Sequence, residues 1–252
     1  MLSIVKSMAL HGLDGYLVDV QVDVSQGLPF WEVVGLPDTS VKEAKERVRT
    51  AIKNSGIDFQ SKRIIVNLAP ADTKKEGSSF DLPIAIGILV ASEDIRTPDK
   101  DIVFLGELSL DGKLNKINGV LPMCIEAKKL GIKKVILPIE NAKEAAIVKD
   151  IQIIPAEYLK EVIDYLNKEK YINPTEIDIE GIFENHKQDK FDFSEVKGQE
   201  SIKRALEIAA AGGHNMLLIG SPGSRKNHAC KKATNYSPRL KLWRSIRNNK
   251  NT

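Results

Sequence analysis

The sequence predicts an α/β protein with a mixed sheet, in which an N-terminal domain at residues 1–167 is followed by a linker and the start of a second domain. Between Val18 and Val24, valines alternate with polar residues, which is the period of a half-buried strand. Strand and helix patterns then alternate up to residue 167, as they do in α/β domains. A polar stretch at 168–190 separates this region from a second apolar one.

The first predicted elements are strands. Residues 1–10 form one, and the pair Asp14-Gly15 signals a hairpin turn before the alternating second strand. A third strand is expected around residues 30–34. Because a hairpin joins antiparallel neighbours, these early elements favour a mixed sheet over a purely parallel one.

The first predicted helix begins after Asp38, a residue suited to the N-cap, and ends at Gly56. Its apolar face consists of Val41, Ala44, Val48, Ala51 and Ile52. The opposite face carries four bases, which are Lys42, Lys45, Arg49 and Lys53. Because Glu43 and Glu46 interleave with these bases, we interpret this face as solvated surface.

The remaining strands and helices are predicted from the same patterns, a period of two for strands and a period of 3.6 for helices. Strands are expected at 62–67, 102–110, 113–117, 134–137 and 151–154, and Asp111-Gly112 signals a second hairpin. Helices are expected at 81–92, 120–130, 140–149 and 157–167. The second domain, 191–224, is expected to begin with a helix carrying Ile202 and Leu206 and an apolar strand at 216–219.

Composition excludes several classes of protein. The net charge is +3, and the basic segment after residue 224 supplies more than all of it, so the charge of the body does not indicate a nucleic-acid-binding protein. The longest apolar stretch, 84–91, is too short to cross a bilayer, and we expect no membrane partner. Cys124 and Cys230 are too far apart for a disulfide framework or a metal knuckle, which favours the cytoplasm.

A segment close to a P-loop follows the apolar stretch 216–219. In a P-loop, backbone N–H groups surround the phosphates, a lysine reaches the outer phosphates and a hydroxyl group binds Mg²⁺. The candidate nucleotide-binding residues are Gly220, Ser221, Pro222, Gly223, Ser224 and Lys226. A strand followed by an ordinary polar turn is the competing interpretation, since glycine, proline and serine also favour turns.

Two residues depart from the P-loop pattern. Arg225 replaces the glycine that lets the backbone approach a phosphate, at a cost of about 1–2 kcal/mol if that position needs a positive φ. Asn227 replaces the hydroxyl residue, and its amide oxygen is a poorer Mg²⁺ ligand. No acidic residue follows Glu207, although P-loop ATPases hold Mg²⁺ with a later carboxylate. We therefore predict a degenerate site with no catalytic residue and no metal site.

The basic tail, 225–252, suggests a shifted reading frame. Codons exist for 225–230 from which removal of a single base yields Gly-Lys-Thr-Met-Leu-Ala, which restores the missing glycine and threonine. We therefore expect the tail to be read out of frame and to be disordered. An open alternative is a non-specific nucleic-acid-binding module in this tail, through Arg239, Lys241, Trp243, Arg244 and Arg247.

Several blocks resemble the magnesium-chelatase-like AAA+ family, the ComM/YifB-like proteins. In the first domain these blocks are Val34–Asp38, Asn67–Asp72, Phe80–Ala85 and Phe104–Leu108. Asp192-Phe193, Val196 and Gly198-Gln199 resemble the start of the family's AAA+ module, and 220–226 resembles its P-loop apart from Arg225. The resemblance covers about residues 1–224.

This resemblance implies hexameric ATPases that use ATP and Mg²⁺ and act on DNA branches during recombination and natural transformation. The implied partners are DNA and further copies of the protein. We expect this chain to be a truncated member that stops before the Mg²⁺ carboxylate, the sensor residues and the arginine finger. It would retain an N-terminal interaction domain, be monomeric or weakly associating, and lack ATPase activity. ATP binding through Arg225 and Lys226 without turnover stays open.

The first domain also resembles the Lon protease domain, a ribosomal-S5-domain-2-like fold. Ser79 lies where that family keeps its nucleophilic serine, and a serine nucleophile needs an adjacent base. The position that matches the Lon lysine is Leu121. We therefore expect no protease activity and interpret Ser79 as a residue at the start of a helix.

Overall fold

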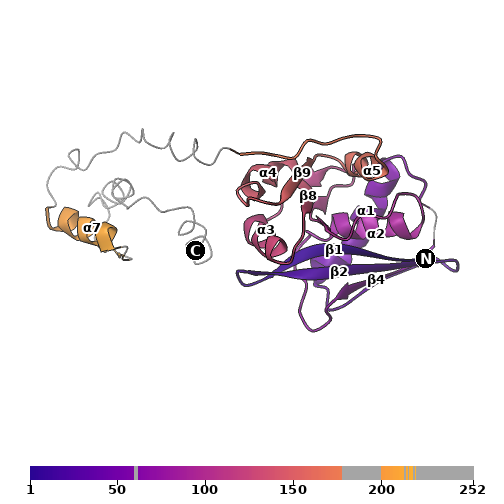
Figure 1. Ribbon diagram of the computed structural model, residues 1–252. Coiled ribbons are helices and arrows are strands. Elements are labelled where there is room, and N and C mark those ends of the chain that lie inside the picture. The colour runs from indigo at the N-terminus through magenta and orange to yellow at the C-terminus, as the bar shows by residue number, and fades with distance from the viewer. Residues whose placement is uncertain (60–61, 178–199, 213, 215, 218, 220–252) are drawn as a thin grey trace. The chain divides into compact units, whose positions relative to one another are not determined.

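The computed structural model describes residues 1–59, 62–177 and 200–212, together with positions 214, 216, 217 and 219 (Figure 1). The chain divides into two units, Met1–Ile177 and Asp178–Thr252. The first unit thus extends past the domain end expected at residue 167. Thr175 N–H donates to the carbonyl of Ile153 at 2.8 Å, and Ile172 packs against the apolar core. These contacts attach the first part of the expected linker to the N-terminal unit.

A seven-stranded sheet forms the centre of this unit, in the order β3-β4-β2-β1-β5-β8-β9. Its strands are β1 (Leu2–His11), β2 (Asp14–Ser25), β3 (Phe30–Val34), β4 (Arg63–Ala69), β5 (Ile102–Phe104), β8 (Lys134–Pro138) and β9 (Gln152–Ala156). The pairs β1–β2 and β2–β4 are antiparallel, and the other four are parallel. The expectation of an α/β protein with a mixed sheet is confirmed.

Helices cover the sheet because successive side chains of a strand point to opposite faces. Val103 and Val135 belong to one apolar cluster with α3 (Val120–Lys129) and α4 (Ile139–Ala145). Their neighbours Phe104 and Ile136 belong to another cluster with α1 (Thr39–Asn54), α2 (Asp81–Ala91) and α5 (Leu159–Asn167). The alternating valines of β2 are also confirmed, since Val18, Val20, Val22 and Val24 are all buried.

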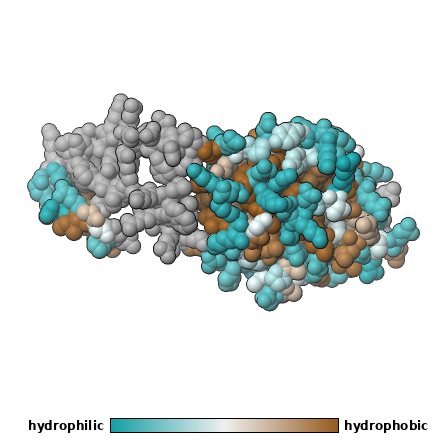
Figure 2. Space-filling model, in the orientation of Figure 1, coloured by the Kyte–Doolittle hydropathy of each residue, from teal (hydrophilic) through white to brown (hydrophobic). Residues whose placement is uncertain are grey.

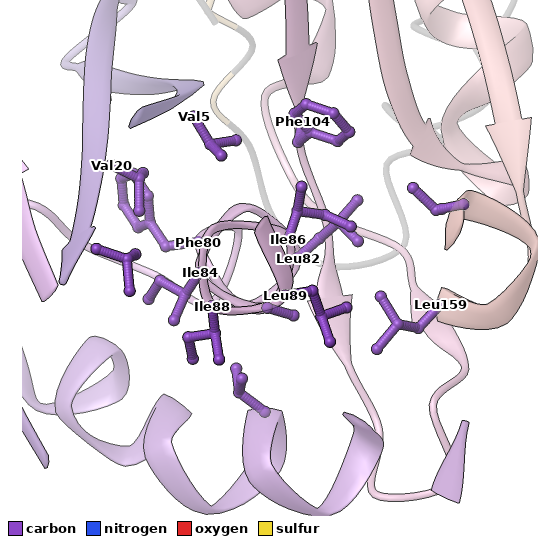
Figure 3. Packing of buried hydrophobic residues seen from close by; sticks show 14 of the residues in the cluster. Val5, Val20, Phe80, Leu82, Ile84, Ile86, Ile88, Leu89, Phe104 and Leu159 are labelled. Atoms are coloured by element: carbon purple, nitrogen blue, oxygen red, sulfur yellow. The ribbon is translucent and has the colours of Figure 1, made fainter. Parts of the chain in front are cut away.

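The helix α2 is the most deeply buried element, since each of its residues is buried. Figure 3 shows its isoleucines and leucines among Val5 and Val20 of the sheet, Phe104 of β5 and Leu159 of α5. Gly87 permits this contact, because a β-carbon there would lie 2.6 Å from Cγ2 of Val22. A helix that is apolar all round needs partners on every side, which α1 and the sheet provide.

The strand expected at 102–110 is interrupted. Gly106 leaves the main sheet, donates to the carbonyl of Ser79 at 3.1 Å and accepts from Leu82 N–H at 3.0 Å. The chain then forms a separate two-stranded ribbon from β6 (Glu107–Leu108) and β7 (Leu114–Asn115). The sequence pattern could not reveal this break, because it results from backbone hydrogen bonds between Gly106 and residues at the start of α2, which are distant in the sequence. The turn expected at Asp111-Gly112 is present, with Gly112 N–H donating to Ser109 O at 2.9 Å.

In the second unit the described residues form α7 (Glu200–Gly212), as the apolar pattern predicts. Leu206 is buried and Ile208 is exposed. The strand expected at 216–219 is not found at the described positions Met216, Leu217 and Ile219. Leu217 and Ile219 are 81% and 88% exposed. A strand needs a neighbour for its N–H and C=O groups, and the described residues of this unit provide none.

On the face shown in Figure 2, hydrophilic residues cover much of the N-terminal unit, with apolar residues between them. Among the described residues, no helix combines the length and the apolar character needed to cross a membrane.

Candidate functional site

The predicted nucleotide-binding residues lie outside the described part of the chain. These are Gly220, Ser221, Pro222, Gly223, Ser224 and Lys226, together with Arg225 and Asn227. The tail residues that could bind nucleic acid, 239–247, also lie outside it. The geometry of a candidate site can therefore be built only within the N-terminal unit.

Four sequence blocks that carry the family resemblance meet within that unit. Three of these blocks lie at the ends of the strands β3, β4 and β5 and in the loops that follow them, and the fourth lies at the start of α2. We call the loops 35–38, 70–79 and 105–108, together with Arg47 and Asp81, the loop cluster. Hydrogen bonds between these loops, described next, bring together residues that are far apart in the sequence.

The first two loops are joined through their backbones. Lys75 N–H donates to Leu36 O at 3.1 Å, and Asp38 N–H donates to Lys75 O at 3.0 Å. The Asp38 carboxylate accepts from Val41 N–H at 2.9 Å, as an N-cap should, and from Gly77 N–H at 3.2 Å. Burial by itself would raise the pKa of Asp38, but these hydrogen bonds and one from Ser40 lower it. Asp38 thus caps α1 and holds the second loop.

Gly35 sets the distance between the first loop and β4. A β-carbon at this position would lie 2.2 Å from the carbonyl oxygen of Leu68, and φ is +97°. Only glycine fits both the contact and the backbone conformation.

Lys75 is the largest fully buried side chain of the loop cluster. Its ammonium group donates to the carbonyl of Thr73 at 2.7 Å and to the carbonyl of Pro70. Burial lowers the pKa of Lys75, which Asp72 partly opposes. Because its donors are used within its own loop, Lys75 acts as an internal brace of residues 70–75 and not as a free reactive amine.

An ion pair between α1 and α2 lies beneath these loops. Arg47 Nε contacts Asp81 Oδ2 at 2.7 Å, and a terminal nitrogen contacts Oδ1 at 3.0 Å. Asp81 also accepts from Leu108 N–H at 3.2 Å. Burial raises the pKa of Asp81 to about 6, although Arg47 opposes this rise. The hydrogen bonds that Arg47 donates to Asp81 raise the pKa of Arg47. Geometry favours an ionised pair near neutral pH, because both carboxylate oxygens have donors.

A polar network continues from the pair into the ribbon. The hydroxyl of Ser78 donates to Glu107, whose other oxygen accepts from Asn115 Nδ2 at 3.3 Å. Asn115 also donates to Ser109 Oγ at 2.9 Å. The polar groups of this network therefore satisfy one another.

The structure also bears on the predicted lack of a protease dyad. Ser79 is 8% exposed, and its carbonyl accepts from Gly106 N–H at 3.1 Å. Leu121 points into the apolar cluster around α3. In the described residues no base is hydrogen-bonded to the hydroxyl of Ser79. A serine nucleophile requires such a base, and the absence of protease activity stays a prediction.

Sequence reasoning missed Arg47 and Lys75. Arg47 could have been found, because it lies three residues after Ala44 and four before Ala51 on the flank of the apolar face of α1. A charge in that position predicts a buried partner. Lys75 carried no comparable signal, since its loop has no periodicity. Within the described ranges, no group of three or more His, Cys, Asp or Glu side chains could hold a metal ion.

Comparison with known proteins connects this geometry to a family. A profile described as "Subunit ChlI of Mg-chelatase" matches residues 20–141, and one described as "Magnesium chelatase, subunit ChlI" matches residues 192–251. The second match extends to residue 251 and so includes most of the tail, 225–252, that we predicted to be out of frame. The match therefore gives no support to a shifted reading frame. The frameshift stays a prediction.

Curated relatives agree with these profiles. The chain is 42% identical over 241 residues to both Competence protein ComM of Haemophilus influenzae and Uncharacterized protein YifB of Escherichia coli. These alignments cover 95% of this chain but 47% and 46% of those proteins, so the chain spans about half the length of the curated relatives it matches.

A more distant similarity supports the fold. The chain is 31% identical over 191 residues to Lon protease 2 of Bacillus subtilis, which covers 68% of this chain and 33% of that protein. This agrees with the expected Lon-protease-domain-like fold. The two profile matches and the ComM and YifB alignments together establish the identity: the chain belongs to the magnesium-chelatase ChlI family and corresponds to the N-terminal part of its ComM/YifB-like members.

Proposed function

We propose that this chain provides the N-terminal interaction domain of an ATP-dependent, DNA-remodelling protein of the ComM/YifB type, and that the chain itself does not hydrolyse ATP. In the family, ATP and Mg²⁺ would be the cofactors, and DNA and further copies of the protein the partners. A relative whose name is Competence protein ComM supports a role in competence.

The observation that carries the loss of ATPase activity is the pair of substitutions at Arg225 and Asn227. The glycine and the hydroxyl residue that they replace have separate tasks, which are close approach to a phosphate and Mg²⁺ coordination. Losing both removes the two interactions that position the outer phosphate for transfer.

The loop cluster supports an interaction role over a catalytic one for the N-terminal unit. Its buried charges already have partners within the protein, and no base is hydrogen-bonded to the Ser79 hydroxyl among the described residues. Such a cluster stiffens the loops that follow β3, β4 and β5. A stiff surface loses less entropy when it binds a partner.

An ATP-hydrolysis assay tests the proposal. The purified 252-residue chain is incubated with ATP and Mg²⁺, with and without single-stranded DNA, beside a Lys226→Ala variant. We expect both proteins to release phosphate at the rate of buffer. Turnover by the parent chain that Lys226→Ala abolishes would contradict the proposal. Calorimetry with ATP separately tests binding without turnover.

The shifted reading frame has its own test in the DNA. We expect codons 224–227 to yield Gly-Lys-Thr in a neighbouring frame, followed by codons for an apolar helix. If the DNA cannot produce that reading, the tail is a genuine part of the protein and the frameshift prediction is wrong.

A further inference from the structure

A hollow of about 230 Å³ opens beside β3, at the edge of the sheet. It lies between β3, α1 and the segment that precedes β4. Its described lining combines aromatic and basic side chains and contains no acidic residue. The lining residues are Pro29, Phe30, Trp31, Lys45, Arg49, Phe59, Lys62 and Ile64, and we call this site the aromatic hollow.

Two aromatic rings of the hollow, those of Trp31 and Phe59, lie close together. The rings of Trp31 and Phe59 lie 6.3 Å apart at an interplanar angle of 34°. Phe30 precedes Trp31 in β3, so its ring points to the opposite face of the sheet, where the guanidinium carbon of Arg63 lies 5.2 Å from the ring centre. Among the described residues, Trp31 Nε1 is the buried side-chain nitrogen or oxygen without a hydrogen-bond partner. A buried indole N–H usually has a partner, and the described residues give this one none.

The basic side chains come from two elements. Lys45 and Arg49 are four residues apart and therefore neighbours on one face of α1. In the described part of the chain neither forms an ion pair with a carboxylate. Lys62 differs, because Asp94 lies close enough for Lys62 to oppose the burial that raises the pKa of Asp94. Lys45 and Arg49 thus provide most of the positive charge that is free to meet an anion.

We propose that the aromatic hollow binds single-stranded nucleic acid, with one unstacked base against the aromatic rings and adjacent phosphates on Lys45 and Arg49. This rests on the proposed DNA role and names the residues of the N-terminal unit that carry it. Exposed bases stack on aromatic side chains while basic residues follow the backbone, and the combination tolerates any sequence. A duplex hides its base faces within the stack, so the hollow favours single strands.

The sequence reasoning assigned Lys45 and Arg49 to solvated surface because Glu43 and Glu46 interleave with them. Arg49 is exposed, as that interpretation expects, but the fold adds the rings of Trp31 and Phe59 to the hollow that these two bases line. Glu43 and Glu46 are exposed and are not part of the lining.

Tryptophan fluorescence can test base stacking directly. The chain contains two tryptophans, so a Trp243→Phe background leaves Trp31 as the reporter. The full chain is titrated with a single-stranded oligothymidylate, the matching duplex, inorganic polyphosphate and polyglutamate. We expect the single strand to quench Trp31, and the duplex and both base-free polyanions to leave its emission nearly unchanged. Equal quenching by polyglutamate would overturn the proposal in favour of an acidic protein partner.

Matched variants separate the hollow from general charge and from the tail. Lys45→Gln with Arg49→Gln should weaken oligothymidylate binding about tenfold at low salt, and should reduce the slope of log affinity against log salt by about 1.4. Lys128→Gln with Lys129→Gln in α3 makes the same charge change and should have little effect. Trp31→Leu should weaken binding about tenfold or more, whereas Trp31→Phe keeps a ring and should retain most affinity.

Two results would contradict the proposal, and they differ in what they mean for the proposed DNA role. If DNA binds but responds only to Arg244→Gln with Arg247→Gln in the tail, the hollow is not the site, and the proposed DNA role survives. If oligothymidylate does not bind at all, both the hollow and the DNA role of this unit are wrong.

Discussion

The loop cluster and the aromatic hollow are both rich in charge, but they use it in opposite ways. In the loop cluster the charged groups of Arg47, Lys75 and Asp38 all have hydrogen-bond partners within the protein: Asp81 of α2, the carbonyl of Thr73 and the N–H of Val41, respectively. In the hollow, Lys45 and Arg49 form no ion pair within the described residues, and the Trp31 N–H has no acceptor there. The comparison teaches that a cluster with satisfied charges stabilises the fold, whereas charges without partners are available for a ligand.

The largest expected effect is on the loop cluster. Arg47→Ala should lower the free energy of unfolding by about 3 kcal/mol, because it leaves the buried Asp81 carboxylate without its countercharge. Urea unfolding, followed by Trp31 emission in the Trp243→Phe background, measures it. Arg49→Ala on the exposed face of α1 is the control and should change little. If both variants lost the same stability, the distinction between the two sites would fail.

The same variant has a predicted pH dependence. A carboxyl whose folded pKa is raised to about 6 binds protons more tightly in the folded state than in the unfolded state. Its contribution to stability is therefore complete below its ordinary pKa near 4 and is lost as the pH rises through about 6. Without Arg47 the pKa should rise further, so the deficit should be larger at pH 8 than at pH 5. A deficit that does not change with pH would contradict this assignment.

A smaller loss is expected at Lys75. Lys75→Met should cost about 2 kcal/mol, because the carbonyl groups of Pro70 and Thr73 lose their donor inside the protein. Its neighbour Lys74 makes only an exposed pair with Glu76, so Lys74→Met should have no measurable effect. The same unfolding experiment compares the two variants. If Lys75→Met caused no loss of stability, the ammonium group would not be needed as a donor to these carbonyl groups.

The Asp38 cap of α1 should contribute less to the free energy of unfolding than Arg47 or Lys75 does. Asp38→Ala removes the acceptor for Val41 N–H and Gly77 N–H and should cost about 1 kcal/mol, whereas Asp38→Ser keeps a cap and should recover most of it. Hydrogen exchange at the first turn of α1 locates the loss. Unchanged exchange there would mean that the second loop, and not the helix, depends on Asp38.

The smallest stability change is expected in the hollow. Lys45→Gln with Arg49→Gln should alter the free energy of unfolding by less than about 0.5 kcal/mol, since partly exposed residues without fixed partners seldom stabilise a fold. The same double variant should nevertheless weaken oligothymidylate binding. A large loss of stability would place these bases in the structural network and would remove the contrast between the two sites.

The pattern-based predictions were confirmed where the signal lies within a single helix or strand. The valines of β2, the Asp38 cap and the helix at 81–92 were all predicted, because alternation, capping residues and apolar runs are local signals. The break at Gly106 and the buried Lys75 were not, because each depends on a backbone group supplied by a distant loop. The predicted phosphate-binding residues at 220–226 remain a sequence-based prediction.

By itself, the sequence determined the mixed α/β fold, the family blocks and the two departures from the P-loop pattern, since these depend on residue type and spacing along the chain. Only the tertiary structure decided which charges are paired. It joined Arg47 to Asp81 across two helices and left Lys45 and Arg49 lining a hollow with the rings of Trp31 and Phe59. The physical reason is that pairing depends on distance in space, and spacing along one helix specifies which face a base occupies but not what the rest of the fold places against it.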